Sequence, residues 1–287
     1  MTLDDELQAA LNRWVQESPL NRLPDDSGPI FDPPLWGCAD GDDPLWAQYQ
    51  TIIGSEHLMP REVLGASPWR PLRVWCWVLP IAEAIRASNR REDAVPSLWW
   101  GQQRQHGEEL NDALRRHAED WLRARGYLAV APVISDRFVI DWSTAGAGPK
   151  SNWSERHAIY VAGMGSFSLS DGFISARGIA MRCGSLVTDA PLSVTPRRSD
   201  DPYALCPELA GGTCGVCIQR CPAGAITAAG HDKVRCLEYQ REAIVPLRDR
   251  LYRVKTIGCG LCQVRVPCEF GIPPRPDADH RAREESA

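Results

Sequence analysis

Eight of the eleven cysteines lie between residues 206 and 268, and no other feature restricts the possible folds of this chain as strongly. In the stretch "TCGVCIQRCPAGAIT", residues 213–227, three of them follow the spacing C-x2-C-x3-C-P. A second C-x2-C pair and a further cysteine follow in "GCGLCQVRVPCEFGIP". The acidic, amphipathic N-terminus is unlike a signal peptide, so we expect a cytoplasmic chain. In that compartment, clustered thiols indicate metal or redox chemistry rather than disulfides.

The remaining composition is that of an ordinary globular protein, with 44% hydrophobic and 24% charged residues in a chain of 287. No apolar run approaches the ~20 residues that a membrane-spanning helix needs, so we expect no membrane partner. The net charge of −5 provides no general attraction to nucleic acid. All eleven tryptophans precede residue 154, apart from the cysteine-rich part. We therefore divide the chain into an N-terminal helix with an irregular wrapping segment (1–70), an α/β domain (71–198), the cysteine region (199–273) and a disordered tail (274–287).

Hydrophobic periodicity predicts the elements of the first two segments. It favours helices at 3–17 and 103–125, the second ended by Gly126, and another helix that starts near Ser154. Residues 72–80 are predicted as a strand, as are "YLAVAPVI" and "RFVID". "FISARGIAMRCGSLVT" fits two short strands or a hairpin, whereas 21–72 shows little periodicity. Strands that alternate with helices indicate an α/β or α+β domain.

The cysteine spacing is typical of two-cluster iron–sulfur proteins, in which C-x2-C-x2-C-x3-C-P supplies thiolate ligands. Gly211 stands at the position of the first cysteine, but eight cysteines still suffice for two sets of four. In such proteins the cysteine after x3 ligates the other cluster, because the chain crosses between the two. That rule groups Cys214 and Cys217 with Cys268, and Cys221 with Cys259 and Cys262. Two cysteines remain, one for each set: the flexible "PELAGGT" lets Cys206 reach back to the first, and Cys236 completes the second. The expected ligands are thus Cys206, Cys214, Cys217 and Cys268 for one 4Fe–4S cluster and Cys221, Cys236, Cys259 and Cys262 for the other.

Two structural zinc ions are the alternative, because C-x2-C pairs also suit zinc. The C-x2-C-x3-C-P run, its "CPAGAIT" continuation and the adjoining Cys–Pro and Pro–Cys steps favour clusters. We expect Cys236 to lie on a helix within "KVRCLEYQREAI". The other three cysteines, Cys38, Cys76 and Cys183, are expected to be small core residues.

Upstream of the cysteines the chain resembles a known family. "NWSERHAIYVAGMGSFSLSDGFIS", followed by "RCGSLVTDAPL" and the doubled cysteine region, is similar to epoxyqueuosine reductases and their relatives, the reductive dehalogenases. The resemblance runs in order over residues 70–272. It implies an α+β fold class: a nitroreductase-like α/β domain that holds cobalamin base-off, then a bacterial ferredoxin-like domain with two 4Fe–4S clusters. A flavin in the α/β domain is the alternative, since nitroreductase-like folds host both.

The resemblance also implies which residues contact the corrinoid. Ala162, Gly163, Met164 and Gly165 match the family's A-G-L-G turn, where glycine lets backbone amides approach a phosphate-bearing tail closely. Residues 168–170, Ser-Leu-Ser, stand where the family often has G-K-N, so this contact differs here. The alternative for the two glycines is a turn that only ends a helix. The other implied contacts are Ser168, Ser170, Ile174, Gly178, Arg182 and Gly184.

The family's proton-donating aspartate does not transfer to this chain. It stands about six residues before a Glu–Arg pair, here 155–156, where this chain has Pro149 and Lys150. We expect the general acid among Asp141, Lys150 and Tyr160 instead. In the alternative, Asp141 caps a turn and Tyr160 is a packing residue.

The expected function is that of a cytoplasmic reductase that passes single electrons from two clusters to a corrinoid and reduces a small-molecule substrate. An external electron donor of the ferredoxin or flavodoxin type would supply the electrons. Two alternatives stay open: an electron-transfer protein that serves a corrinoid or flavin partner, and a short epoxyqueuosine reductase that acts on tRNA. RNA recognition favours basic surface and stacking aromatics. Trp99 and Trp100 are better explained as core or pocket wall than as such a platform.

Overall fold

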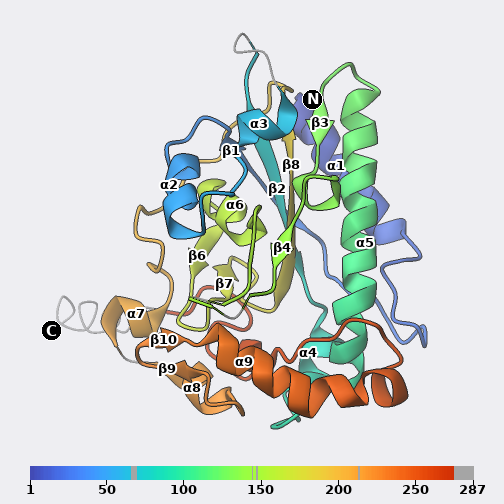
Figure 1. Ribbon diagram of the computed structural model, residues 1–287. Coiled ribbons are helices and arrows are strands. Elements are labelled where there is room, and N and C mark those ends of the chain that lie inside the picture. Colours follow the sequence, from blue (N-terminus) through green and yellow to red (C-terminus); the bar gives the residue numbers. More distant parts are fainter. Residues whose placement is uncertain (66–69, 144, 147, 213, 275–287) are drawn as a thin grey trace, which may run out of the picture.

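A four-stranded antiparallel sheet lies at the centre of the molecule (Figure 1). The computed structural model describes residues 1–65, 70–143, 145–146, 148–212 and 214–274. The strand order is β1-β2-β8-β3, formed by Leu35–Asp40, Arg73–Pro80, Met181–Thr188 and Ala129–Val130. β2 pairs with β8 along its whole length, from Arg73 opposite Thr188 to Pro80 opposite Met181. The expected mixture of helix and sheet is confirmed.

Both faces of the sheet are buried. Successive residues of β2 point to opposite faces, and the residues on each face are apolar. Trp75 and Trp77 belong to a core with α1 (Leu3–Glu17) and α5 (Leu98–Arg123). Val74, Cys76 and Val78 belong to a second core with α2, α3 and α6, the last of which begins after the N-cap Ser154. These three helices span Leu45–Ile52, Pro60–Leu64 and Glu155–Val161. The predicted helices at 3–17, 103–125 and from 154 are therefore confirmed.

The cysteine region packs against the N-terminal end of α5 and against α4 (Glu83–Asn89), as the orange ribbon in Figure 1 shows. Two hydrogen bonds hold it there. The Tyr252 hydroxyl donates to the Pro96 carbonyl at 2.6 Å, and the guanidinium of Arg220 donates to Asp93 at 2.7 Å. The elements of this region are α7 (Pro207–Gly211), α8 (Val216–Arg220), β9 (Ile226–Thr227), β10 (Gly230–His231), α9 (Lys233–Tyr239), π turns at Gln240–Ile244 and Arg248–Tyr252, and 3-10 turns at Val245–Leu247 and Leu261–Gln263.

Two short hairpins and one turn complete the α/β part. β4 (Ile140–Asp141) pairs with β5 (Lys150–Ser151), and β6 (Gly165–Phe167) pairs with β7 (Phe173–Ser175). A 3-10 turn covers Pro132–Ile134. Within the described part of the chain, no helix combines the length and the apolar character needed to cross a bilayer.

One element prediction was wrong. The segment 21–72, expected to be irregular, contains β1, α2 and α3, and β1 is an edge strand of the main sheet. "FISARGIAMRCGSLVT" forms two strands, which was one of the two arrangements expected for it. They are not the hairpin of the other arrangement, since β7 pairs with β6 while β8 lies between β2 and β3. The predicted disordered tail, 274–287, lies outside the described residues except for Pro274.

Candidate functional site

Four of the cysteines gather around α7 and α8. Cys206 is the N-cap of α7, and the left-handed Gly212 ends that helix and returns the chain toward Cys214 and Cys217. Burial, followed by the nearby thiols of Cys217, Cys206 and Cys214, raises the pKa of Cys268 to about 12. These four therefore share one electrostatic neighbourhood, formed from three separate stretches of chain.

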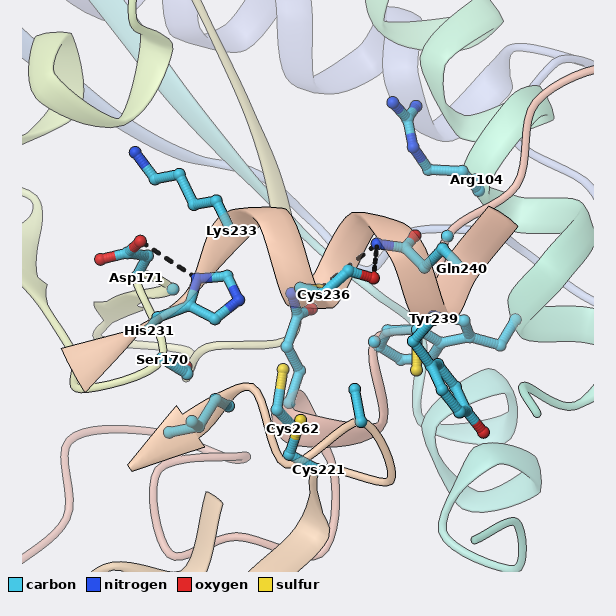
Figure 2. Close-up of a pocket in the computed structure, with 18 of the residues that line it drawn as sticks. Arg104, Ser170, Asp171, Cys221, His231, Lys233, Cys236, Tyr239, Gln240 and Cys262 are labelled. Carbon is cyan, nitrogen blue, oxygen red and sulfur yellow. Dashed lines mark hydrogen bonds and ion pairs between the residues drawn. The ribbon is translucent and has the colours of Figure 1, made fainter. Parts of the chain in front are cut away.

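The other four cysteines form a second neighbourhood beneath α9. Burial raises the pKa of Cys262 well above its usual value, and the thiols of Cys259, Cys236 and Cys221 add to that effect, as does the more distant Cys217. Cys236 lies on α9, as predicted, and Figure 2 shows it on the same side as Cys221 and Cys262. This division into two sets is the one the spacing predicts.

The two sets fit clusters in number and chemistry, with four thiols in each. Among the described residues, no three His, Cys, Asp or Glu side chains form a group that could hold a metal ion. The assignment of the eight cysteines as cluster ligands stays a prediction.

The remaining cysteines are core residues, as expected. Cys38 and Cys76 are buried in the two cores beside the sheet, and Cys183 packs against the second of them. Burial raises the pKa of Cys38 and of Cys183 to about 12, which keeps both thiols protonated and unreactive at neutral pH.

A cavity of about 450 Å³ lies between the second cysteine set and the sheet domain. Figure 2 shows α9 crossing it, with His231 and Lys233 toward one end and Gln240 and Arg104 toward the other. The cavity is within the size range of small-molecule sites. Its walls come from α5 (Trp100, Gln103, Arg104), β8 (Met181, Arg182), the β6–β7 loop (Ser170, Asp171, Gly172) and the cysteine region (Cys221, His231, Lys233, Cys236, Tyr239, Gln240, Cys259, Cys262).

His231 connects this cavity with the second cysteine set. Its Nδ1 lies 3.1 Å from a carboxylate oxygen of Asp171. Burial by itself would lower the pKa of His231, but hydrogen bonds with Asp171 and Cys236 raise it to about 9. The side chain is therefore a cation at neutral pH, placed between a cavity carboxylate and a predicted cluster ligand.

Arg182 and Arg104 stand on the opposite wall and share one carboxylate. A terminal nitrogen of Arg182 lies 3.2 Å from Oε2 of Glu108, and Nη1 of Arg104 lies 3.7 Å from the same oxygen. The other oxygen of Glu108 accepts hydrogen bonds from the buried Arg115 at 2.9 Å and from Asn111 at 3.2 Å. Burial would raise the pKa of Glu108, but Arg182 and Arg115 hold it at about 2, so it remains ionised.

Two of the ten residues implied to contact the corrinoid line this cavity, Ser170 and Arg182. Other residues of the chain occupy the space beside Gly163 and Gly165. A Cβ at Gly163 would lie 2.5 Å from the Pro196 carbonyl oxygen, and one at Gly165 would lie 2.0 Å from that of Ile174. Chain packing thus accounts for glycine at both positions, and their cofactor role stays a prediction.

The other implied contacts are also packing positions. A Cβ at Gly178 would meet the backbone of Glu269 and one at Gly184 the ring of Trp77, while Ser168 is buried and bonded to Ser170. Ile174 is buried in the core beside the first cysteine set. Ala162 is buried and Met164 half-buried in the second core.

None of the three candidate proton donors lines the cavity beside the cysteines. Tyr160 is buried, and its hydroxyl donates to the backbone carbonyls of Ser199 and Asp200 at 3.2 and 3.0 Å. Asp141 and Lys150 are opposite each other in the β4–β5 pair and line a separate cavity of about 220 Å³. The packing interpretation of Tyr160 explains these contacts, and a catalytic role for the three stays untested.

Several cavity residues were not predicted from the sequence. Trp100, Gln103 and Arg104 belong to the first two turns of α5, and only Trp100 was foreseen as a possible pocket wall. Asp171 and His231 are 60 residues apart and meet only through the packing of β10 on the β6–β7 loop. The only sequence signal for Gln103 and Arg104 was the amphipathic pattern of α5. Both residues lie about two turns before the first core positions of that helix.

Comparisons with known proteins agree with this architecture. No protein-family model matches the chain, and no curated protein matches it in sequence. Among solved structures, an epoxyqueuosine reductase from Bacillus subtilis superposes with a TM-score of 0.52 at 14% identity, over 95% of this chain and 66% of that one. An epoxyqueuosine reductase with an epoxyqueuosine-modified tRNA-Tyr stem loop gives 0.51 at 15% identity, over 94% and 67%. A catabolic reductive dehalogenase gives 0.48 at 15%, over 97% and 38%.

This chain thus spans about two thirds of the length of the epoxyqueuosine reductases that it matches. The similarity extends over nearly the whole of this chain, from the sheet domain through the cysteine region. The resemblance noted in the sequence is confirmed at the level of structure, and the chain has the fold of the epoxyqueuosine reductases.

Proposed function

We propose that this protein is a cobalamin-dependent iron–sulfur reductase of the epoxyqueuosine reductase-like group that acts on a small molecule. One observation carries the proposal. The second set of cysteines and the sheet domain contribute to the walls of the same cavity, so a ligand bound there would lie directly beside Cys221, Cys236, Cys259 and Cys262.

The residues present suit the groups that the proposal requires. Two sets of four thiols are available for two 4Fe–4S clusters, and the nearer set would hold its cluster against the cavity. Gln103 is 2% exposed, lines the cavity and has no hydrogen-bond partner for its carbonyl oxygen among the described residues. Such an acceptor suits the carboxamide-rich edge of a corrinoid. When bound, the clusters supply single electrons and the corrinoid supplies a low-potential cobalt centre.

The chain's own residues would position the ligand and hold charge in this cavity. His231 is a cation held by Asp171 beside Cys236, and a hydrogen bond to a ligating sulfur tunes a cluster's potential. Trp100 lines the cavity and packs against Gly260, between Cys259 and Cys262 in the chain. We propose that the electrons come from an external donor of the ferredoxin or flavodoxin type.

Metal analysis of anaerobically purified protein, produced with cobalamin, iron and sulfide, tests the proposal. We expect about eight irons and one cobalt per chain. Cys206→Ala and Cys236→Ala should each lose about half of the iron, because each removes one ligand from a different set. Cys183→Ala is the matched control and should keep all of it. Zinc in place of iron would overturn the cluster assignment.

Two other functions give different results in the same preparation. Iron without cobalt, at full occupancy, would favour the electron-transfer protein over the reductase. A tRNA substrate is the second alternative, because one of the similar structures is an epoxyqueuosine reductase with a modified tRNA stem loop. Conversion of epoxyqueuosine in that stem loop by the loaded protein would establish it in place of a small molecule.

A further inference from the structure

The walls of the main cavity are strongly cationic although the chain as a whole is acidic. Arg104, Arg156, Arg182 and Lys233 line it, against a single lining carboxylate, that of Asp171. Glu108 pairs with Arg104 and Arg182 from behind this wall. These four cationic side chains therefore still outnumber the two carboxylates, in a protein whose net charge is −5. A concave surface of one sign selects ligands of the opposite sign.

The arginines of the α5–β8 wall have fewer acceptors than they can use. Arg104 and Arg182 share one oxygen of Glu108, whose second oxygen is taken by Arg115 and Asn111. Nε of Arg182 is buried and has no hydrogen-bond partner within the described chain. A guanidinium carries five N–H donors, so two guanidinium groups that share one carboxylate oxygen leave most of their donors without an acceptor. The wall offers paired donors without enough protein acceptors.

The same wall holds a buried acceptor with no donor. Gln103 is 2% exposed and its carbonyl oxygen is unpartnered in the described structure. An orphaned buried polar atom is costly unless a ligand satisfies it. The complementary ligand therefore carries both an oxyanion and a hydrogen-bond donor.

We infer that Arg104 and Arg182 form an oxyanion subsite of the cavity, which takes the carboxylate or phosphate group of an organic acid, with Gln103 accepting a hydrogen bond from the same ligand. This inference rests on the proposed function in one respect: it names the substrate class of that reductase as anionic. The oxyanion can come from the substrate or from the phosphate of the corrinoid's nucleotide tail. Both sources present the same group to the two guanidinium groups.

Binding to corrinoid-free protein tests the subsite without reference to turnover. Calorimetric titration should show benzoate binding to the parent more tightly than benzamide, its neutral isostere. Arg182→Gln and Arg104→Gln should each weaken benzoate binding by about tenfold or more, the effect of losing a charge-assisted hydrogen bond. Benzamide binding should not change. Arg241→Gln, at an exposed position outside the cavity, is the control and should bind benzoate as the parent does.

The two sources are separated by corrinoid uptake. If the arginine variants take up cobinamide normally but cobalamin poorly, the oxyanion is the nucleotide phosphate, because cobinamide lacks it. If uptake of both is unchanged while benzoate binding is lost, the oxyanion belongs to the substrate. Equal benzoate affinity in the parent and in both variants would overturn the subsite. Near-ultraviolet circular dichroism checks the fold of each variant, and Arg104→Gln, at the less buried side chain, serves if Arg182→Gln misfolds.

Failure of the proposed function gives a distinct result. Protein that holds no iron or cobalt but binds benzoate through Arg104 and Arg182 would refute the reductase and retain the subsite. Protein that holds both metals but shows no arginine-dependent benzoate binding would refute the subsite and retain the reductase.

Discussion

Gly178 joins the sheet domain to the cysteine region, and Gly178→Ala is the most direct test of that contact. Its φ is +91°, in the region that disfavours side chains, and an added Cβ would lie 2.0 Å from the carbonyl oxygen of Glu269. The adjacent amide of Ile179 donates to the Cys268 carbonyl at 2.9 Å. The new methyl group would therefore push directly on the residue next to a predicted cluster ligand.

The expected cost has two parts. The positive φ by itself costs an alanine about 1–2 kcal/mol. The clash requires a backbone oxygen to move by roughly 1 Å, and overpacking of this kind costs about 1–3 kcal/mol more. We expect Gly178→Ala to lower the free energy of unfolding by about 2–5 kcal/mol in total. A backbone shift at Cys268 should also reduce the iron held by the first cysteine set.

Gly126→Ala separates the two parts of that cost. Gly126 has a similar φ of +84°, but a Cβ there would meet no atom within 4 Å. The control should show only the backbone cost and keep its full iron content. The assay is denaturant unfolding together with iron analysis of both variants. Equal destabilisation and equal iron content would refute the argument that the contact of Gly178 with Glu269 positions Cys268.

Two further predictions concern the sheet domain. The indole N–H of Trp77 donates to buried Asn111 at 2.7 Å, whereas that of Trp75 has no acceptor among the described residues. Trp77→Phe should therefore lower the unfolding free energy by about 1–3 kcal/mol more than Trp75→Phe, and equal losses would contradict this. Burial lowers the pKa of His57 to about 4, below the ~6.5 of the unfolded chain. The contribution of neutral His57 to the free energy of unfolding is therefore complete above about pH 6.5 and is lost as the pH falls toward 4. That loss is about 3 kcal/mol, so His57→Gln should flatten the fall in stability over this range, measured by tryptophan fluorescence, and an unchanged pH profile would exclude the cause.

Much of the helical structure could be predicted from the sequence, because its signals are local. The capping box at Thr2 and the apolar spacing of α1 lie within one short stretch. The strand β1 was missed because its residues, "LWGCAD", gain their pairing only from β2, more than thirty residues away. The choice between two strands and a hairpin at β7 and β8 stayed open for the same reason, since β8 is a central strand whose partners are distant.

The residues of the candidate site also divide into those with a local sequence signal and those without one. The two sets of cysteines follow from spacing, because short spacings and a known crossing rule restrict which thiols can meet. Ser170 and Arg182 were named through the family resemblance, whereas Arg104 and Lys233 could not be predicted, because they come from two separate helices with no common motif. The roles of Gly163 and Gly165 could not be decided from the sequence either. A glycine required by packing and one required by a ligand look identical in a sequence.

Different turns of the long helix α5 are constrained by different parts of the structure. Its central and C-terminal turns supply Leu110, Leu114, Ala118 and Leu122 to the core of the sheet domain. Its first two turns supply Gln103 and Arg104 to the cavity and contribute only Trp99 and Trp100 to that core. Substitutions in these turns can therefore change the walls of the cavity while the leucine packing farther along the helix is retained.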